Sequence, residues 1–343
     1  LVVSTPELVP ESKIDLVLDL PAIDASGLGQ TVDNTWLEIQ PQLPGKLHWK
    51  APNIAEFLPD QPPAIATTYT FSISPNHKHL DDSPVPAGKF ATLASEPFRI
   101  VSSSAPQRWK ADYSPSTGAW MLVFNDEIDP ATAGSFITFS SKSGERIAAE
   151  LRRATMKRAG YLARNYRPWT ARWGAPPDAE IPPETPAPNI LIARPLSPLP
   201  PGKGWQLAIL KGLPNHSATT RLAADVQYHI GDIAPFEITK IASRVAADQP
   251  RRISLTYNHL LPEELPADFI EKFVAIVPTP ETLSAEVDRQ TIHLTGDLLG
   301  DDQYSVTVHP GFESRDGFPL KKGKTEKIKF EHLDPRIALP SED

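Results

Sequence analysis

The sequence predicts an all-β protein made of tandem, immunoglobulin-like (Ig-like) antiparallel β-sandwich domains, and three observations support this. Short runs of alternating apolar and polar residues occur along the chain, and this period places one set of side chains on a buried sheet face. The 343 residues include 38 prolines, about twice the average usage. Proline lacks an amide donor and breaks helices, so it is typical of strand edges, turns and linkers. The third observation is an internal repeat.

The repeat is clearest in residues 304–320, YSVTVHPGFESRDGFPL. The same order occurs in residues 69–85, YTFSISPNHKHLDDSPV, and more loosely in residues 205–222, WQLAILKGLPNHSATTRL. Each copy has an aromatic opener, a short strand, Pro or Gly, a polar turn and a return to apolar residues. An apolar strand precedes each copy, at residues 14–19, 120–125 and 253–258. We therefore expect three units that share one order of strands and turns. The alternative is chance similarity among short apolar strands.

The first unit is predicted to span about residues 1–100. Residues 90–100 are expected to close its sandwich, and Ser102–Ser104 to form a short linker. Its other expected strands are residues 14–19, 36–39, 46–50 and a strand that begins at Tyr69.

The second unit is predicted at residues 101–234, with an insertion at about 155–189. From Val123 to Trp205 the chain takes 82 residues, whereas the corresponding steps in the other units take 51 and 49. Residues 148–154 are compatible with a strand or one short helix. Its other expected strands are residues 119–124, 136–139, 190–194 and a strand that begins at Trp205.

The third unit is predicted at residues 235–332, and residues 333–343 are expected to form a tail or a linker to a following domain. Residues 265–273 are the best candidate for a helical turn, with Pro266 near its start. The expected strands are residues 236–241, 291–294 and 327–330.

Composition excludes several classes of protein. A net charge of −8 gives no general attraction to nucleic acid or anionic lipid. No apolar run is long enough to span a membrane directly. The absence of cysteine excludes disulfides and thiol chemistry within the chain. Because it starts at Leu1 without the regions of a signal peptide, a processed chain or an excised fragment is expected.

The search for catalytic chemistry gives little. The sequence has no Gly-x-Ser-x-Gly elbow, phosphate loop, dinucleotide fingerprint or His-Glu-x-x-His motif. His77 and His79 beside Asp81 and Asp82 have a spacing that a divalent metal could use, but exposed turn residues are the favoured interpretation. Asp126, Glu127 and Asp129 lack the ligand spacing of a calcium loop. We therefore predict no catalytic, cofactor-binding or metal-ligating residues, no cofactor and no enzymatic activity. A β-sandwich hydrolase is a third, minor alternative.

The insertion contains the candidate interaction surface. Tryptophan, tyrosine and arginine are the residue types enriched at binding hot spots, and their flat faces also stack on sugars or bases. The alternative is that the rings pack the insertion against its own domain under arginine stems. Its basic and acidic halves are expected to fold back on each other, and to pack on unit two or at a domain boundary, setting the angle between neighbours. The candidate residues are Tyr161, Arg164, Tyr166, Arg167, Trp169, Arg172 and Trp173.

Several motifs resemble a known family. LVLDLPAID, then WLEIQPQLPGKLHW, then FLPDQPPAIATTYTFSIS resembles the amino-terminal macroglobulin/Ig-like domains of bacterial alpha-2-macroglobulin-like proteins. The segment YSVTVHPGFESRDGFPL is similar to the closing strand and turn of such domains, and LDPRIALP at residues 333–340 to the lead into the next one. The matching positions are Trp49, Phe57, Pro59, Thr68 and Tyr69.

The resemblance implies a protease-trapping protease inhibitor, in which cleavage of a bait region exposes a Cys–Gln thioester to the protease. With no cysteine, this chain can supply only a non-catalytic scaffold segment. The resemblance also implies an extracytoplasmic location, in the periplasm or on the cell surface. Other domains of the same larger protein, and target proteases, are the implied partners. An Ig-like cell-surface adhesion or carbohydrate-binding module is the alternative.

Overall fold

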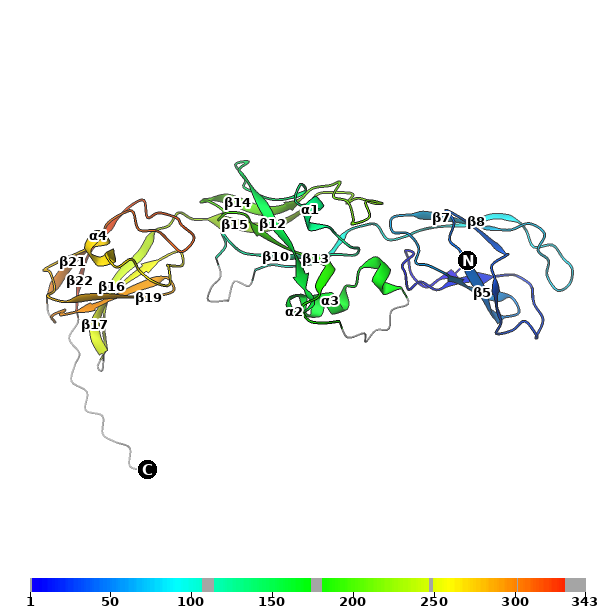
Figure 1. Ribbon diagram of the computed structural model, residues 1–343, viewed down its shortest axis with the longest axis horizontal. Coiled ribbons are helices and arrows are strands. Elements are labelled where there is room, and N and C mark those ends of the chain that lie inside the picture. Colours follow the sequence, from blue (N-terminus) through cyan, green and yellow to red (C-terminus); the bar gives the residue numbers. More distant parts are fainter. Residues whose placement is uncertain (1, 107–113, 174–180, 247–248, 301, 331–343) are drawn as a thin grey trace, which may run out of the picture.

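A computed structural model of the chain describes residues 2–106, 114–173, 181–246, 249–300 and 302–330. Strands make up 45% of the chain and helices 7%, which confirms the all-β prediction. Three β-sandwich units follow one another along the long axis of the molecule, with the amino-terminal unit at one end and the carboxy-terminal unit at the other (Figure 1).

Unit one contains two antiparallel sheets, with strand orders β1-β2-β6-β5-β3 and β4-β7-β8. Alternation explains their faces: in β4 the two apolar residues are buried and the two polar ones exposed. The strands are β1 (Val2–Val3), β2 (Ile14–Val17), β3 (Thr31–Asp33), β4 (Leu37–Gln40), β5 (Gly45–Ala51), β6 (Ile54–Pro59), β7 (Thr68–Ile73) and β8 (Gly88–Ala94).

Unit two forms one continuous seven-stranded sheet, β15-β14-β11-β12-β13-β10-β9, which folds over on itself. The long strand β12 joins its halves, because its first residues pair with β11 and its later residues with β13. The elements are β9 (Ile100–Ser104), β10 (Trp120–Phe124), α1 (Pro130–Ala133), β11 (Ile137–Ser140), β12 (Arg146–Thr155), α2 (Met156–Ala159), α3 (Tyr161–Asn165), η1 (Trp169–Arg172), β13 (Pro186–Pro195), β14 (Gly202–Ile209) and β15 (Val226–Ile233).

Unit three has sheets β16-β17-β20-β19 and β18-β21-β22. The expected helical turn is present as the five residues of α4. The elements are β16 (Ile238–Ala246), β17 (Gln249–Tyr257), α4 (Phe269–Phe273), β18 (Val274–Val277), β19 (Leu283–Asp288), β20 (Thr291–Gly296), β21 (Gln303–Val308) and β22 (Lys324–Lys329).

The three units share one strand order. If the repeated strands of each unit are lettered A to G along the chain, leaving out β3, every unit pairs A-B-E-D and C-F-G. This is the strand order of a seven-stranded immunoglobulin sandwich. The repeat recognised in the sequence therefore corresponds to a repeated topology.

The aromatic opener of the repeat has a defined role at the start of strand F. Tyr69 and Tyr304 are buried, and their hydroxyls accept hydrogen bonds from the amides of Ala64 and Leu299, at 2.7 Å in each case. Both bonds reach back five residues, as in the tyrosine corner of immunoglobulin domains. In unit two Trp205 occupies this position, and the direction of the hydrogen bond is reversed: the side chain is the donor. Its Nε1 donates to the carbonyl of Pro200, again five residues back.

The loop between strands F and G also has the same features in all three units. In each unit the loop carries one isolated antiparallel bridge and two residues with positive φ at matching positions. The bridged residues are six positions apart in units one and three and seven positions apart in unit two. The bridges pair Lys78 with Pro84, Pro214 with Arg221 and Glu313 with Pro319.

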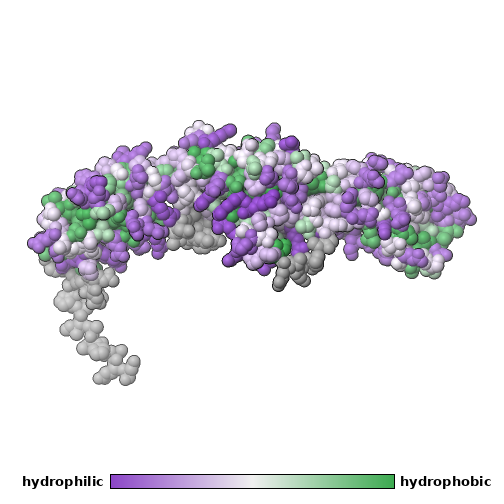
Figure 2. All heavy atoms as spheres, in the orientation of Figure 1, coloured by the Kyte–Doolittle hydropathy of each residue, from purple (hydrophilic) through white to green (hydrophobic). Residues whose placement is uncertain are grey.

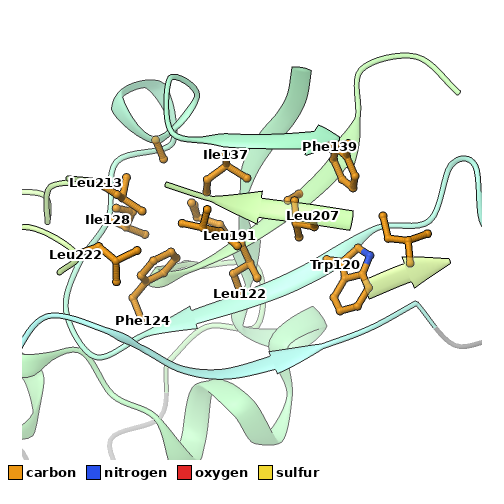
Figure 3. Packing of buried hydrophobic residues seen from close by; sticks show 14 of the residues in the cluster. Trp120, Leu122, Phe124, Ile128, Ile137, Phe139, Leu191, Leu207, Leu213 and Leu222 are labelled. Atoms are coloured by element: carbon orange, nitrogen blue, oxygen red, sulfur yellow. The ribbon is translucent and has the colours of Figure 1, made fainter. Parts of the chain in front are cut away.

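Each unit has its own apolar core, which lies between the two sheets of units one and three and between the two halves of the folded sheet of unit two. Figure 3 shows this packing in unit two, where Leu122 and Leu191 from one half of the sheet meet Ile137 and Leu207 from the other half. The core of unit two also takes in residues from the connection to unit one, including Phe98, whose ring stacks on Phe124 at 5.7 Å between centroids. The first junction is therefore partly apolar.

One detail differs from the sequence prediction. Ser102–Ser104 were expected to be a linker, but they belong to β9 and pair with β10, so that prediction was wrong. Small polar residues hid the strand because it lies at a sheet edge, where apolar alternation is not required. Residues 148–154 are a strand. The expected tail at 333–343, including LDPRIALP, lies outside the described residues.

Candidate binding groove at the junction of units one and two

The insertion of unit two connects strands D and E. In units one and three the same connection is a tight hairpin of two residues, between Ala51 and Ile54 and between Asp288 and Thr291. In unit two it takes residues 156–185, which include α2, α3 and η1. The two ends of the insertion meet, since the amides of Met156 and Lys157 donate to the carbonyls of Thr185 and Pro183.

The helices of the insertion cover the outer face of the A-B-E-D sheet. Leu162 and Ala163 of α3 pack on Val123, Ile190 and Ile192, and all five are buried. Strands β10 and β13 are therefore buried on both faces, which explains why their sequences are continuous apolar runs rather than alternating ones. Packing of the insertion on unit two was expected, and these contacts confirm it.

Trp169 extends the insertion to unit one. Its side chain is 3% exposed, and its Nε1 donates to the carbonyl of Pro63 at 2.6 Å. Pro63 lies between β6 and β7, so this hydrogen bond crosses the domain boundary. The ring serves the junction and is not free for a ligand.

Arg172 makes the second contact across this boundary. Its Nε and Nη2 donate to the two carboxylate oxygens of Glu11, at 2.8 and 2.7 Å, and its Nη1 donates to Glu96 at 3.3 Å. Its guanidinium also lies 5.5 Å from the centre of the Trp169 ring. Burial by itself would lower the pKa of Arg172, but the hydrogen bonds and charges of Glu11 and Glu96 outweigh it and raise the pKa. The planar fork of arginine suits such two-point pairing.

Glu96 is the buried centre of this network. Its side chain is 8% exposed, and it also pairs with Arg99, three residues on. Asn125 fixes the same turn, since its side chain accepts from the amide of Arg99 and donates to the carbonyl of Pro97. A buried carboxylate is tolerated when it is paired in this way.

A groove of about 560 Å³ lies beside this network. It is lined by the insertion, by the start of strand β9 and by unit one, so it exists only where the two units meet. Four arginines and two glutamates contribute, which leaves an excess of two positive charges. The lining residues are Glu11, Glu96, Arg99, Val101, Asn125, Arg164, Asn165, Tyr166, Arg167 and Arg172.

The other predicted surface residues are divided between burial and solvent. Tyr161 is 62% exposed and does not line the groove. Tyr166 is half-buried, packs beside the α3 core and accepts a hydrogen bond at its backbone carbonyl from Asn189. Trp173 is half-buried, and Arg164 is exposed. Of the seven predicted residues, the groove brings together Arg164, Tyr166, Arg167 and Arg172.

A second junction, which the sequence did not indicate as a contact, joins units two and three. Ser114 and Ser116 lie before β10 and are buried, and both hydroxyls donate to the same oxygen of Asp316 at 2.5 Å. Asp316 belongs to the Asp-Gly turn in the F–G loop of unit three. The turn itself was readable from the sequence, but the two serines follow no recognisable motif.

The histidine-rich loop of unit one is held by ordinary loop contacts. His77 stacks on Trp36 at 4.1 Å, and one of its ring nitrogens lies 2.8 Å from the carbonyl of Thr35. Asp81 accepts from the amide and hydroxyl of Ser83, which lowers the pKa of Asp81. Within the described residues, no three His, Asp or Glu side chains form a group that could hold a metal ion.

One Ser–His contact lies in unit three. Ser254 Oγ and His293 Nδ1 are 3.1 Å apart on neighbouring strands, and burial lowers the pKa of His293. Glu286 pairs with His293 in strand register, but the two side chains form no ion pair in the described part of the chain. The two residues do not line the groove at the junction of units one and two.

Comparisons with known proteins leave the family open. No protein-family model and no curated protein matches the sequence. Among solved structures, the chain is similar to domains 1–6 of the surface layer protein SbsC, with a TM-score of 0.23, 10% identity and coverage of 97% of this chain and 54% of that one. The chain thus spans about half the length of that structure.

A second similar structure is native alpha-2-macroglobulin from Escherichia coli spanning domains MG0-NIE-MG1. Its TM-score is 0.21, with 9% identity and 96% coverage of both chains. At such scores neither structure superimposes on the chain as a whole, so the fold rests on the strand order described above.

None of the described helices is long and apolar enough to cross a membrane.

Proposed function

We propose that this chain is a non-catalytic scaffold segment of an exported, alpha-2-macroglobulin-like protease-trapping protein. The observation that carries the scaffold role is the pair of bridged junctions. Three sandwiches of one topology stand in a row, and side chains cross both boundaries between them. Linked domains without such contacts move relative to one another, so bridged junctions suit a segment that holds its neighbours in place.

The two junctions resist bending by different means. At the first, the Trp169 ring and the Glu96 carboxylate are buried, so the contact of Glu96 with Arg172 is stronger than an exposed pair, whereas the carboxylate of Glu11 is half exposed. At the second, one carboxylate accepts from two buried hydroxyls. Separating the units at either junction would expose apolar surface or leave polar groups without their partners.

The protease-trapping role is drawn from the sequence resemblance. In such a protein the thioester would lie in another domain, because this chain has no cysteine. Its partners would be the other domains and, after bait cleavage, the trapped protease. The same proposal places the protein outside the cytoplasm, in the periplasm or at the cell surface.

The test uses the complete protein that contains this segment. We expect trypsin to become covalently attached to it, as a protease-sized shift on a denaturing gel, and prior treatment with methylamine to abolish the shift by opening the thioester. The 343-residue chain by itself should form no such adduct. If the complete protein forms no adduct and leaves trypsin fully active, the trapping role is wrong; binding to a glycan array would then support the adhesion or carbohydrate-binding alternative.

A further inference from the structure

The F–G loop of unit three is a contact surface for the neighbouring unit. Asp316 at its tip is half-buried and accepts hydrogen bonds from the hydroxyls of Ser114 and Ser116. The two serines lie between β9 and β10, in the A–B connection of unit two. The A–B connection of one sandwich therefore faces the F–G loop of the next, and an aspartate in that loop joins the two units.

The F–G loop of unit one is built in the same way. Its isolated bridge joins residues six positions apart, as in unit three, and aspartate stands three positions after the first bridged residue in both loops, at Asp81 and Asp316. The residue before this aspartate ties each loop to the B–C connection of its own unit. The amide of Leu80 donates to the carbonyl of Pro21 at 2.9 Å, and the amide of Arg315 makes the corresponding bond at 2.9 Å. Asp81 therefore occupies the place from which Asp316 reaches unit two.

The corresponding surface of unit one faces solvent in this chain. Ser83 donates to one carboxylate oxygen of the exposed Asp81, and the other oxygen, Oδ2, accepts no hydrogen bond from the described residues. Beside it, Leu80 is 55% exposed, and Leu20, whose carbonyl lies 3.1 Å from Nδ1 of His79, is 43% exposed. The loop lies at the end of the row farthest from unit two (Figure 1). A carboxylate oxygen and apolar surface are therefore both available for a contact at this end.

Unit two shows that the aspartate distinguishes the loops that can dock. At the position of Asp81, the F–G loop of unit two has Ser217, whose hydroxyl contacts the side chains of Asn215 and Thr219 within the loop. Among the described residues, no hydrogen bond links the tip of this loop to unit one, and the insertion joins the two units instead. Of the loops of units two and three, the one with the aspartate is therefore the one that bridges to the preceding unit.

The charges of the loop in unit one favour a neutral donor over a charged ligand. Lys78 pairs with Asp82 at 3.6 Å, so the carboxylate that remains in the loop is that of Asp81. One carboxylate beside two leucines suits a partner that offers a hydroxyl and an apolar side chain, because stable interfaces combine an apolar centre with a few hydrogen bonds. The A–B connection of a β-sandwich can offer a hydroxyl, as unit two does with its serines.

We propose that the B–C and F–G end of unit one docks a further β-sandwich domain of the same larger protein, whose A–B connection donates hydrogen bonds to Asp81 and covers Leu20 and Leu80. The proposal rests on the chain being a segment of a larger scaffold, and it adds the surface and the chemistry by which the row is extended. It does not rest on protease trapping. A second copy of this chain is the other occupant that the experiment distinguishes.

The experiment measures how fast a maleimide labels the Leu80→Cys variant of the complete protein and of the 343-residue chain, with the label at position 80 read by peptide mass spectrometry. In the otherwise cysteine-free chain, this position should react at the rate of an exposed thiol. In the complete protein we expect labelling to be slower by about tenfold or more, because the docked domain covers the loop until it opens locally. Leu58→Cys is the matched control, since Leu58 is 39% exposed on β6, outside this end, and should react equally in both proteins.

Two substitutions in the Leu80→Cys background test the role of Asp81. Asp81→Ala should restore most of the labelling rate in the complete protein, whereas Asp82→Gly should leave it slow, since Gly317 occupies that loop position in unit three. Equal labelling of position 80 in both proteins, no effect of Asp81→Ala, or protection that appears in the 343-residue chain as its concentration rises would each overturn the proposal. Slow labelling in a protein that forms no trypsin adduct would support the docking and defeat the trapping role alone.

Discussion

Trp169 places a large indole ring between two units and leaves almost none of it exposed. Its burial and its hydrogen bond to Pro63 make it the single residue of the insertion with the largest expected effect on stability. Replacing a buried tryptophan side chain by alanine lowers the free energy of unfolding by about 3–5 kcal/mol, because buried contacts are lost and a cavity remains.

We therefore expect Trp169→Ala to lower the unfolding temperature of units one and two, measured by differential scanning calorimetry of the whole chain. Tyr161→Ala is the control, since Tyr161 is 62% exposed in the same insertion and should change the free energy of unfolding by no more than about 0.5 kcal/mol. Similar effects of the two substitutions would contradict the junction role of Trp169.

The tyrosines of unit three allow a second test at this scale. Tyr304 accepts a hydrogen bond from the amide of Leu299, whereas the buried hydroxyl of Tyr257 has no hydrogen-bond partner among the described residues. Burial raises the pKa of Tyr257 accordingly. Loss of a typical intramolecular hydrogen bond costs about 0.5–1.5 kcal/mol, while removing an unpaired buried polar group is neutral or stabilising.

Tyr304→Phe should therefore destabilise unit three by about 0.5–1.5 kcal/mol in urea unfolding. Tyr257→Phe, with the same change of one oxygen, should leave stability unchanged or raise it. Tyr69→Phe should behave like Tyr304→Phe in unit one, because its hydroxyl makes the equivalent bond to Ala64. A larger loss from Tyr257→Phe than from Tyr304→Phe would disprove this account of the corner.

Among the secondary-structure elements, α1 depends on a single capping carboxylate. Asp129 accepts from the amide and the hydroxyl of Thr132, at 3.0 and 2.7 Å. The hydroxyl bond, followed by the amide bond, lowers the pKa of Asp129 below its ordinary value of 3.8. The pKa of Asp129 is lower in the folded chain than in the unfolded chain. The ionised carboxylate therefore stabilises the fold fully above the ordinary pKa, and this stabilisation is lost as the pH falls through the pKa of the folded chain.

Asp129→Asn keeps a capping oxygen but cannot titrate. Between about pH 5 and pH 2, we expect the unfolding temperature of the wild-type chain to fall more steeply than that of this variant. Thermal unfolding followed by circular dichroism across this range makes the comparison. Parallel curves for the two proteins would show that Asp129 does not contribute in this way.

The insertion is a larger element with two contacts, one to the outer sheet face of unit two and one to unit one. Replacement of residues 161–185 by a short Gly-Ser link would expose Val123, Ile190 and Ile192 and remove Trp169 and Arg172. We expect a lower melting temperature for unit two and a broader distance distribution in small-angle scattering. Unchanged melting and unchanged shape would leave the insertion as a binding surface only.

For the whole molecule, the row of units depends on how each unit meets the next. Figure 2 shows that hydrophilic residues cover most of one face, with separate hydrophobic areas rather than one continuous stripe. The side-chain contacts that hold the row lie at its two junctions. The second junction can be tested with a single substitution, because the carboxylate of Asp316 accepts the hydrogen bonds from both serine hydroxyls.

Asp316→Ala should loosen the angle between units two and three, because the buried hydroxyls of Ser114 and Ser116 lose their acceptor. Dyes on cysteines introduced into the two units, which a cysteine-free chain permits, should report a wider distribution of energy-transfer distances. Asp81→Ala is the matched control, since Asp81 occupies the equivalent loop position in unit one and its carboxylate accepts hydrogen bonds within its own loop, from Ser83. A distribution as narrow as that of the wild-type chain would refute the role of Asp316.

The sequence by itself determined the β-rich class, the threefold repeat and most strand positions. These features depend on local chemistry: alternation sets the faces of strands, proline and glycine set turns, and an aromatic residue opens strand F. Tyr69 and Tyr304 could be matched from sequence because the repeat keeps them at the same place in each F–G segment. The edge strand β9 was missed because Ser102–Ser104 carry no apolar signal.

Only the tertiary structure decided which surfaces meet. Trp169 and Pro63 are 106 residues apart, and Ser116 and Asp316 are 200 apart. No local pattern relates such residues, because their contact depends on how complete units are oriented. The groove beside Arg164 has the same origin: its arginines and glutamates come from two units, so its excess charge exists only when the units are packed together.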